Sequence, residues 1–175
     1  MSTWEKEKSQ SQSGGWGAGA GKNHFRGFDQ IDPQMTRNPY IPGDCSGRLA
    51  VEECRVVEST QRAKGAFFLV SFTATEPLVG YKIEGEERVV SRVEQGDPVD
   101  WLAKLDNESY LRSIKALMLA LNPDASPRDF TEETMNAIVS EEQPLTGVTV
   151  KFRSSMIKTS KGSDFTKIYW ITDDE

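Results

Sequence analysis

Five stretches of the chain alternate apolar and polar side chains with the period of two that is typical of half-buried β-strands. In the second stretch, Phe68, Val70 and Phe72 share one parity and are predicted to face a core, whereas Phe67 and Leu69 are predicted to face outward. The five predicted strands are residues 48–58, 66–75, 86–94, 147–156 and 165–172.

The first predicted strand changes parity partway along its length. Leu49 and Val51 occupy odd positions, whereas Cys54 and Val56 occupy even ones. Such a change requires an extra residue near Glu52, that is, a β-bulge that bends the strand. The strands of a small barrel need a bend of this kind to close.

Between the third and fourth predicted strands the apolar period changes to that of a helix. Apolar residues recur at helical spacing over residues 110–121, Asp106 or Asn107 can cap the start, and Asn122 followed by proline ends the pattern. A second, shorter helix is predicted over residues 131–141. The order β-β-β-α-β-β predicts a mainly β fold with an α insert, a five-stranded OB-type barrel whose helices lie between strands three and four.

The first 38 residues differ in composition from the rest of the chain. They are rich in Gly, Ser, Gln and charge, and they show no sustained apolar period. Too little apolar surface is present there to offset the entropy of ordering the chain. We therefore predict a flexible tail over residues 1–38 and one OB-fold domain over residues 39–175.

The sequence contains no motif of a catalytic, metal or cofactor site. The segment GAGAGKN resembles a phosphate-binding loop, but that motif requires Gly where Trp16 stands and Ser or Thr where Asn23 stands. The only histidine, His24, lies in the predicted tail without neighbouring metal ligands. We expect a protein that is not an enzyme and holds no metal or cofactor.

The cellular compartment is predicted from the small number of cysteines and the short apolar runs. Two cysteines, Cys45 and Cys54, are too few for a disulfide framework, and the longest apolar run, residues 116–121, is too short to span a bilayer. No apolar segment typical of a signal peptide is found near the N-terminus. These features predict a cytoplasmic protein without a membrane partner.

Charge is distributed unevenly along the chain, whose net charge is −6. Residues 94–142 contain eleven acidic and four basic residues, whereas residues 146–170 contain five basic residues and the single acid Asp164. A single-strand-binding protein needs a positive groove and not a positive total. The C-terminal part of the chain is therefore a candidate for contact with phosphates.

An exposed aromatic ring beside cations can stack on a base while the cations contact phosphates. If the second and third predicted strands pair, Phe67 lies on the same outer surface as Arg88 and Arg92. In an OB barrel, the loops between strands one and two and between strands four and five flank the same groove. The candidate nucleic-acid-binding residues are therefore Arg62, Lys64, Phe67, Arg88, Arg92, Lys151, Arg153, Lys158, Lys161, Lys167, Tyr169 and Trp170.

Two alternatives stay open for this set. The strand cations can equally solubilise exposed strands and discourage edge-to-edge pairing. Tyr169 and Trp170 are adjacent and must point to opposite faces, but the pattern does not decide which ring is exposed. The parity of Ile168 favours a buried Trp170, whereas Phe165 and Ile171 favour a buried Tyr169.

With these elements, the chain resembles the OB-fold single-stranded-DNA-binding proteins of tailed bacteriophages. The similarity extends over residues 40–172, in the segments YIPGDCSGRLAVEECRVVES, GAFFLVSFTATE, YLRSIKALMLALNP, GVTVKFRSS and KGSDFTKIYWI. It implies sequence-tolerant binding of single-stranded DNA, or alternatively RNA, in phage replication or recombination. It also implies the cytoplasm of a host cell, and phage or host replication proteins as partners.

One departure from this family concerns partner recruitment. Many members end in an acidic tail that recruits replication partners, but here the acidic end is only residues 172–175. An alternative function is that of a non-enzymatic structural or assembly protein, which uses the barrel for protein–protein contacts. The acidic helical segment and the long N-terminal tail suit that alternative.

Overall fold

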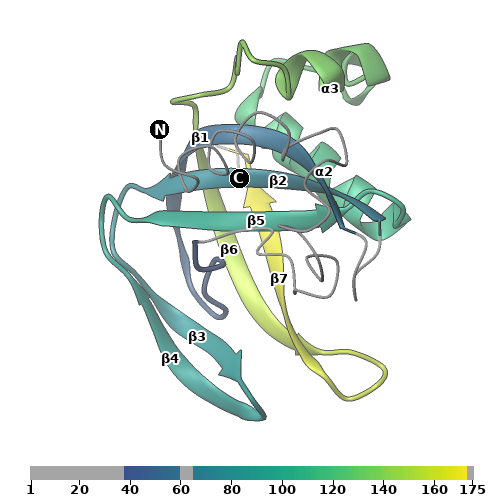
Figure 1. The fold of residues 1–175 in the computed structure, drawn as a ribbon. Coiled ribbons are helices and arrows are strands. Elements are labelled where there is room, and N and C mark those ends of the chain that lie inside the picture. The colour runs from purple at the N-terminus through teal and green to yellow at the C-terminus, as the bar shows by residue number, and fades with distance from the viewer. Residues whose placement is uncertain (1–37, 60–64, 173–175) are drawn as a thin grey trace, which may run out of the picture. The chain divides into compact units, whose positions relative to one another are not determined.

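The structure is a computed structural model that describes residues 38–59 and 65–172 (Figure 1). Residues 1–37 of the predicted flexible tail lie outside the described residues. The described elements are β1 (Ser46–Ser59), β2 (Gly65–Ala74), β3 (Leu78–Glu84), β4 (Glu87–Val93), β5 (Pro98–Lys104), α2 (Glu108–Leu121), the 3₁₀ helix η3 (Pro127–Asp129), α3 (Glu132–Ile138), β6 (Thr149–Lys158) and β7 (Asp164–Ile171).

Five of the strands form one antiparallel sheet with the order β5-β2-β1-β6-β7. The first strand, β1, lies between β2 and β6, the strand that follows the helices. The sheet is not closed, because its edge strands β5 and β7 share no ladder within the described residues. The sequence predicts a closed or nearly closed barrel, and the structure has an open, barrel-like sheet.

The strands β3 and β4 form a separate two-stranded sheet. The third predicted strand corresponds to β4, and the expectation that it pairs with the second is wrong, because β2 pairs with β5 on that side. Both β3 and β5 were missed by the sequence pattern. The helices consequently follow β5 and precede β6, and they do not lie between strands three and four.

The missed strand β3 resembles a loop in sequence because Gly80 interrupts it. A Cβ atom at Gly80 would lie 2.2 Å from the carbonyl oxygen of Gly43, so glycine is required for this close approach. The approach is held by two backbone hydrogen bonds between Gly43 and Tyr81, at 2.7 and 2.9 Å. Gly80 therefore marks the contact between the β3–β4 hairpin and the segment before β1.

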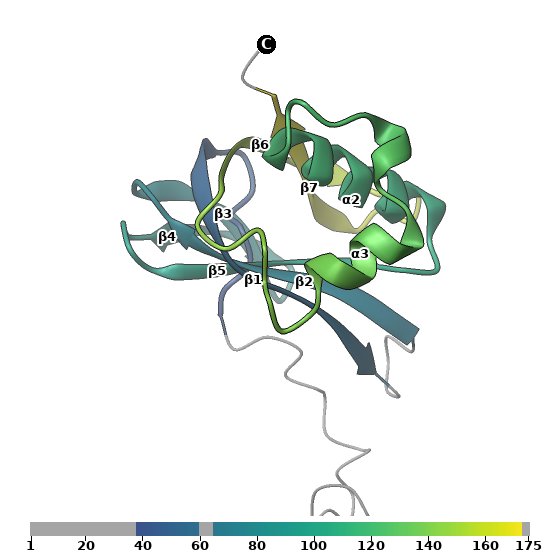
Figure 2. The same ribbon diagram turned by 90° about the horizontal axis from the view of Figure 1, so that it is seen from above.

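The core lies between the sheet and α2, which contacts β5, β6 and β7. Phe68, Val70 and Phe72 of β2 are buried as their parity predicts. The predicted long helix is confirmed as α2, which is capped by the Asn107 side chain at the backbone amides of Ser109 and Tyr110. Figure 2 shows α2 and α3 on one side of the sheet.

Burial along β1 changes parity within the strand. Leu49 and Val51 are buried, Glu52 and Glu53 are both exposed, and Cys54 is buried again. Two consecutive exposed residues are the parity change that a bulge produces. Burial along β1 therefore changes parity at the residues where the sequence pattern predicts a bulge.

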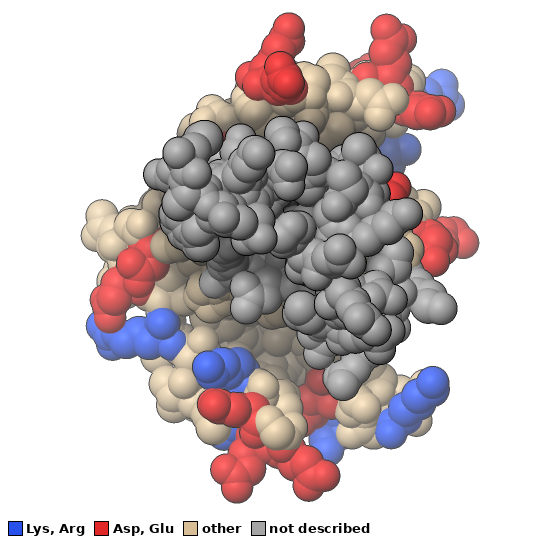
Figure 3. Space-filling model, in the orientation of Figure 1, with Lys and Arg blue, Asp and Glu red and all other residues tan. Residues whose placement is uncertain are grey.

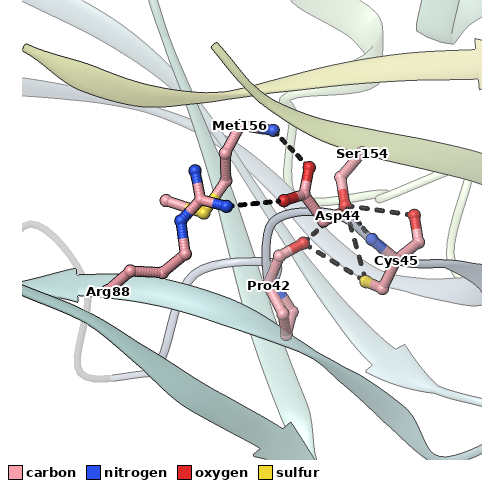
Figure 4. A network of polar contacts seen from close by, with 6 residues as sticks. All are labelled: Pro42, Asp44, Cys45, Arg88, Ser154 and Met156. Carbon is pink, nitrogen blue, oxygen red and sulfur yellow. Dashed lines mark hydrogen bonds and ion pairs between the residues drawn. The ribbon is translucent and has the colours of Figure 1, made fainter. Parts of the chain in front are cut away.

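A polar network fastens the segment before β1 to β6 and to the hairpin (Figure 4). Asp44 accepts a hydrogen bond from the backbone amide of Met156 at 2.8 Å, and its second oxygen lies 3.3 Å from the guanidinium of Arg88. The Ser154 hydroxyl donates to the carbonyl of Pro42 at 2.6 Å and accepts from the amide of Cys45 at 3.0 Å. These contacts join parts of the chain that are far apart in sequence.

Candidate nucleic-acid interface

Two cations lie close to the aromatic ring of Tyr169 on the outer face of β6 and β7. The guanidinium carbon of Arg153 lies 4.7 Å from the ring centroid, and the ammonium nitrogen of Lys167 lies 5.0 Å from it. Both cationic residues are exposed and Tyr169 is half-buried. We call these three residues the Tyr169 cluster.

The strand register explains why the three side chains meet. Arg153 of β6 is directly opposite Tyr169 of β7, and Lys167 is two residues before Tyr169 and so on the same face. The intervening residues point inward, and Phe152, Ile168 and Trp170 are buried. Alternation in two neighbouring strands thus sorts the apolar side chains to the core and the cations to the surface.

This geometry answers which of the two adjacent rings is exposed. Trp170 is buried against Phe72 and Trp101, with ring centroids 5.6 and 5.2 Å apart. Its indole cannot contact a ligand on the outer face, so Tyr169 is the ring available there. Ile168 gave the right parity for this strand.

Three further predicted cations belong to the same hairpin. Lys158 and Lys161 are exposed in and beside the loop that joins β6 to β7. Lys151 is half-buried and shares the parity of Arg153 on β6. In Figure 3 a basic side chain projects at the lower right, where Figure 1 places the β6–β7 loop. The Tyr169 cluster and the loop therefore form one basic hairpin surface.

Phe67 is buried, although the sequence pattern predicts that it is exposed. It faces away from the core residues Phe68 and Val70, which is the predicted parity, but only 7% of its surface is accessible, and Leu69 is completely buried. The predicted outward platform on β2 is therefore absent from the described surface. The residue opposite Phe67 is Lys104 of β5, which was missed because β5 was not predicted. The alternation of Val99, Trp101 and Ala103 is the signal that could have revealed this strand.

Arg88 and Arg92 lie on the separate hairpin and do not share a surface with Phe67. Arg88 forms an ion pair with Asp44, and Arg92 forms one with Glu94 that lowers the pKa of that carboxyl. Each cation therefore has an acidic partner in the folded protein. Two more candidates, Arg62 and Lys64, lie outside the described residues.

An acidic feature borders the other edge of the sheet. Asp100 of β5 is buried and accepts a hydrogen bond from the side-chain amide of Asn38 at 3.1 Å. Burial and the negative charge of Asp100 raise the pKa of Tyr40, whose backbone forms a bridge with Asp100. A carboxylate at this position disfavours phosphate there, so the positive surface is on the β6–β7 side.

No protein-family model matches the chain, and no curated protein matches it significantly.

Within residues 38–59 and 65–172, no group of three or more His, Cys, Asp or Glu side chains could hold a metal ion. Among the helices described there, none has the length and apolar character needed to cross a membrane.

Proposed function

We propose that the protein binds single-stranded DNA without sequence preference through the basic β6–β7 hairpin. The observation that carries this proposal is the Tyr169 cluster, in which one half-buried ring is flanked by Arg153 and Lys167. A tyrosine offers a π-face on which any base can stack, and the neighbouring cations suit the phosphates on either side. The contacts need no base-specific hydrogen bond.

The strand order supports an OB-type barrel as the framework of this site. If the β3–β4 hairpin is treated as an insertion, the remaining strands number one to five along the chain, and their order in the sheet is 3-2-1-4-5. OB folds are five-stranded, partly open barrels whose ligands contact the loop between strands four and five. In this chain that loop joins β6 to β7 and carries Lys161.

Charge supports the same surface. Residues 146–170 carry a net charge of +4 within a chain of net charge −6. A local positive field draws a polyanion to one face while the rest of the molecule repels it. The resemblance to phage proteins extends the proposal to replication or recombination in a host cell.

The test is a titration of fluorescent oligo(dT) with the full chain at several salt concentrations. If Arg153, Lys158, Lys161 and Lys167 each contact one phosphate, the log–log slope of affinity against salt should be about −3, since each contact on a single strand contributes about 0.7. A duplex of the same length should bind more weakly, because paired bases cannot stack on Tyr169. Salt-independent affinity, or equal affinity for the duplex, would overturn the proposal in favour of an assembly role.

A further inference from the structure

A cavity of about 460 Å³ opens between α2, α3 and the ends of β1 and β2. Its floor is apolar and buried, formed by Phe68, Ile114 and Met118. At its rim, Leu111 is 44% exposed and Val56 is 46% exposed. Exposed apolar side chains beside a preformed apolar cavity are typical of a surface that another molecule covers.

The surroundings of the cavity are acidic. The helical segment 106–142 contains eight acidic and three basic residues, a net charge of −5. The cavity itself is lined by two acidic residues, Glu108 and Glu132, and two basic ones, Arg112 and Lys115, and Arg112 pairs with Glu108 at 2.6 Å. The excess of negative charge therefore belongs to the helical segment around the cavity. In Figure 3 acidic side chains project at the top, where Figure 1 places α3. A polyanion such as DNA is repelled from this side of the protein.

From these observations we infer that the cavity is a docking site for a basic, amphipathic segment of a partner protein. An apolar side chain of the partner enters between Leu111 and Met135, and its Lys or Arg residues face Glu132 and the acidic helical segment around the cavity. Helical segments commonly bind apolar grooves in this way, with anchors spaced three and four residues apart. The inference does not depend on DNA binding by the opposite, basic hairpin.

Charge also argues against a second copy of this chain as the occupant. A symmetric dimer through this face places the same patch of both subunits in contact. Two segments of net charge −5 would then oppose one another. A basic partner removes this repulsion and adds electrostatic complementarity to the apolar contact.

The experiment uses the methionine methyl groups of the full chain as NMR probes. Met118 and Met135 line the cavity, whereas Met156 lies in the Asp44 network and serves as an internal control. The labelled protein is titrated with a synthetic Leu/Lys peptide of helical amphipathic pattern, with its scrambled version, and with a Leu/Glu peptide of the same pattern. We expect saturable shifts of Met118 and Met135 with the patterned Leu/Lys peptide alone, and no shift of Met156.

Variants give the second readout. Leu111→Asp should weaken binding of the patterned peptide about tenfold, the effect expected for an interface anchor, without unfolding the protein because Leu111 is exposed. Val90→Asp is the matched control, since Val90 is exposed on the β3–β4 hairpin. Glu132→Lys should weaken the Leu/Lys peptide and favour the Leu/Glu peptide, and Glu87→Lys on the hairpin should do neither.

Several results would overturn the inference. It fails if no peptide moves Met118 and Met135, if the Leu/Glu or scrambled peptide binds equally well, or if Val90→Asp weakens binding as much as Leu111→Asp. Shifts of Met118 and Met135 that depend on protein concentration alone would identify a second copy as the occupant. Shifts caused by Phe25→Ala or Phe28→Ala in the absence of peptide would identify the chain's own N-terminal segment.

Discussion

The indole of Trp101 stands edge-on to that of Trp170, with ring centroids 5.2 Å apart and an interplanar angle of 86°. Trp101 lies on β5 and Trp170 on β7, the two edge strands of the five-stranded sheet. Packing of these rings therefore joins the two edges where no backbone ladder is present in the described strands. Helix α2, which contacts both β5 and β7, covers the same opening.

This contact predicts a measurable coupling between the two tryptophans. Trp101→Leu, Trp170→Leu and the double variant should give a coupling free energy of about 0.5–1.5 kcal/mol, the range for aromatic pairs beyond area burial. Unfolding by urea, followed by far-UV circular dichroism, measures it. Trp101→Leu combined with Val90→Ala is the control, and it should be additive because Val90 is exposed on the separate hairpin. An additive tryptophan pair would show that the edges are joined by other contacts.

A second prediction concerns Gln143, whose side chain makes hydrogen bonds with the backbone of β1 at Cys54. Its amide oxygen accepts from the backbone nitrogen of Cys54 and its amide nitrogen donates to the carbonyl of the same residue, both at 2.8 Å. Gln143→Ala should lower the free energy of unfolding by about 1–3 kcal/mol, because it leaves two backbone groups without partners. Denaturant unfolding measures the loss.

The backbone conformation of Gln143 makes it possible to separate the loss of its side-chain hydrogen bonds from the cost of a positive φ at a residue with a Cβ atom. Its φ is +44°, a conformation that glycine adopts more easily than alanine. Gln143→Gly removes the same side chain without the backbone penalty, so it should be less destabilising than Gln143→Ala but clearly worse than wild type. If Gln143→Gly is as stable as wild type, the side-chain hydrogen bonds contribute nothing measurable.

The sequence pattern predicted those elements whose periodicity is set by one buried face. The alternation in β2, β6 and β7, the helical period of α2 and the parity change near Glu52 all reflect local burial, and the structure has them. The strands β3 and β5 begin beside prolines at positions 77 and 98, and Gly80 interrupts β3. Because proline and glycine have low β-propensity, these segments resemble loops in the sequence. Their pairing depends on contacts with residues far along the chain, which periodicity does not encode.

The part of the candidate site that lies within one hairpin could be predicted from the sequence. Arg153, Lys167 and Tyr169 belong to one hairpin, so strand parity alone brings them to one face. Phe67, Arg88 and Arg92 were grouped by an assumed pairing of two strands that are not neighbours. The ion pairs of the two arginines differ in sequence separation. Arg92 pairs with Glu94, which is two residues away, whereas Arg88 pairs with Asp44, which is 44 residues away and cannot be predicted from local sequence.

A third prediction follows from the thiol of Cys54, because burial raises its pKa to about 12 and the charge of Glu53 adds to the effect. In the unfolded chain the thiol has its ordinary pKa near 9.0. The folded state therefore keeps a proton that the unfolded state loses above that pH, so stability is present below pH 9 and falls as pH rises towards 12. The slope is about 1.4 kcal/mol per pH unit.

The measurement compares wild type with Cys54→Ala in urea at pH 8 and pH 10. Wild type should lose about 1.4 kcal/mol more than the variant over this interval, since the unfolded thiol is ionised over roughly one pH unit of it. The other titrating groups are present in both proteins and cancel in the difference. Identical pH dependence would mean that the folded state ionises Cys54 as easily as the unfolded chain does.

The last prediction compares two tyrosines that each have a cation over the ring. Tyr169 has Arg153 at 4.7 Å on the basic hairpin, and Tyr81 has Arg88 at 5.8 Å on the β3–β4 hairpin, where Asp44 neutralises the guanidinium. Tyr169→Ala should weaken binding of oligo(dT) by about 1–3 kcal/mol, the range for base–aromatic stacking. Tyr81→Ala should leave the affinity unchanged, although Tyr81 is itself 39% exposed. Arg153→Ala and Lys167→Ala should each reduce the salt slope by about 0.7. Equal losses from Tyr169→Ala and Tyr81→Ala, with both proteins folded, would remove the basic hairpin as the specific binding surface.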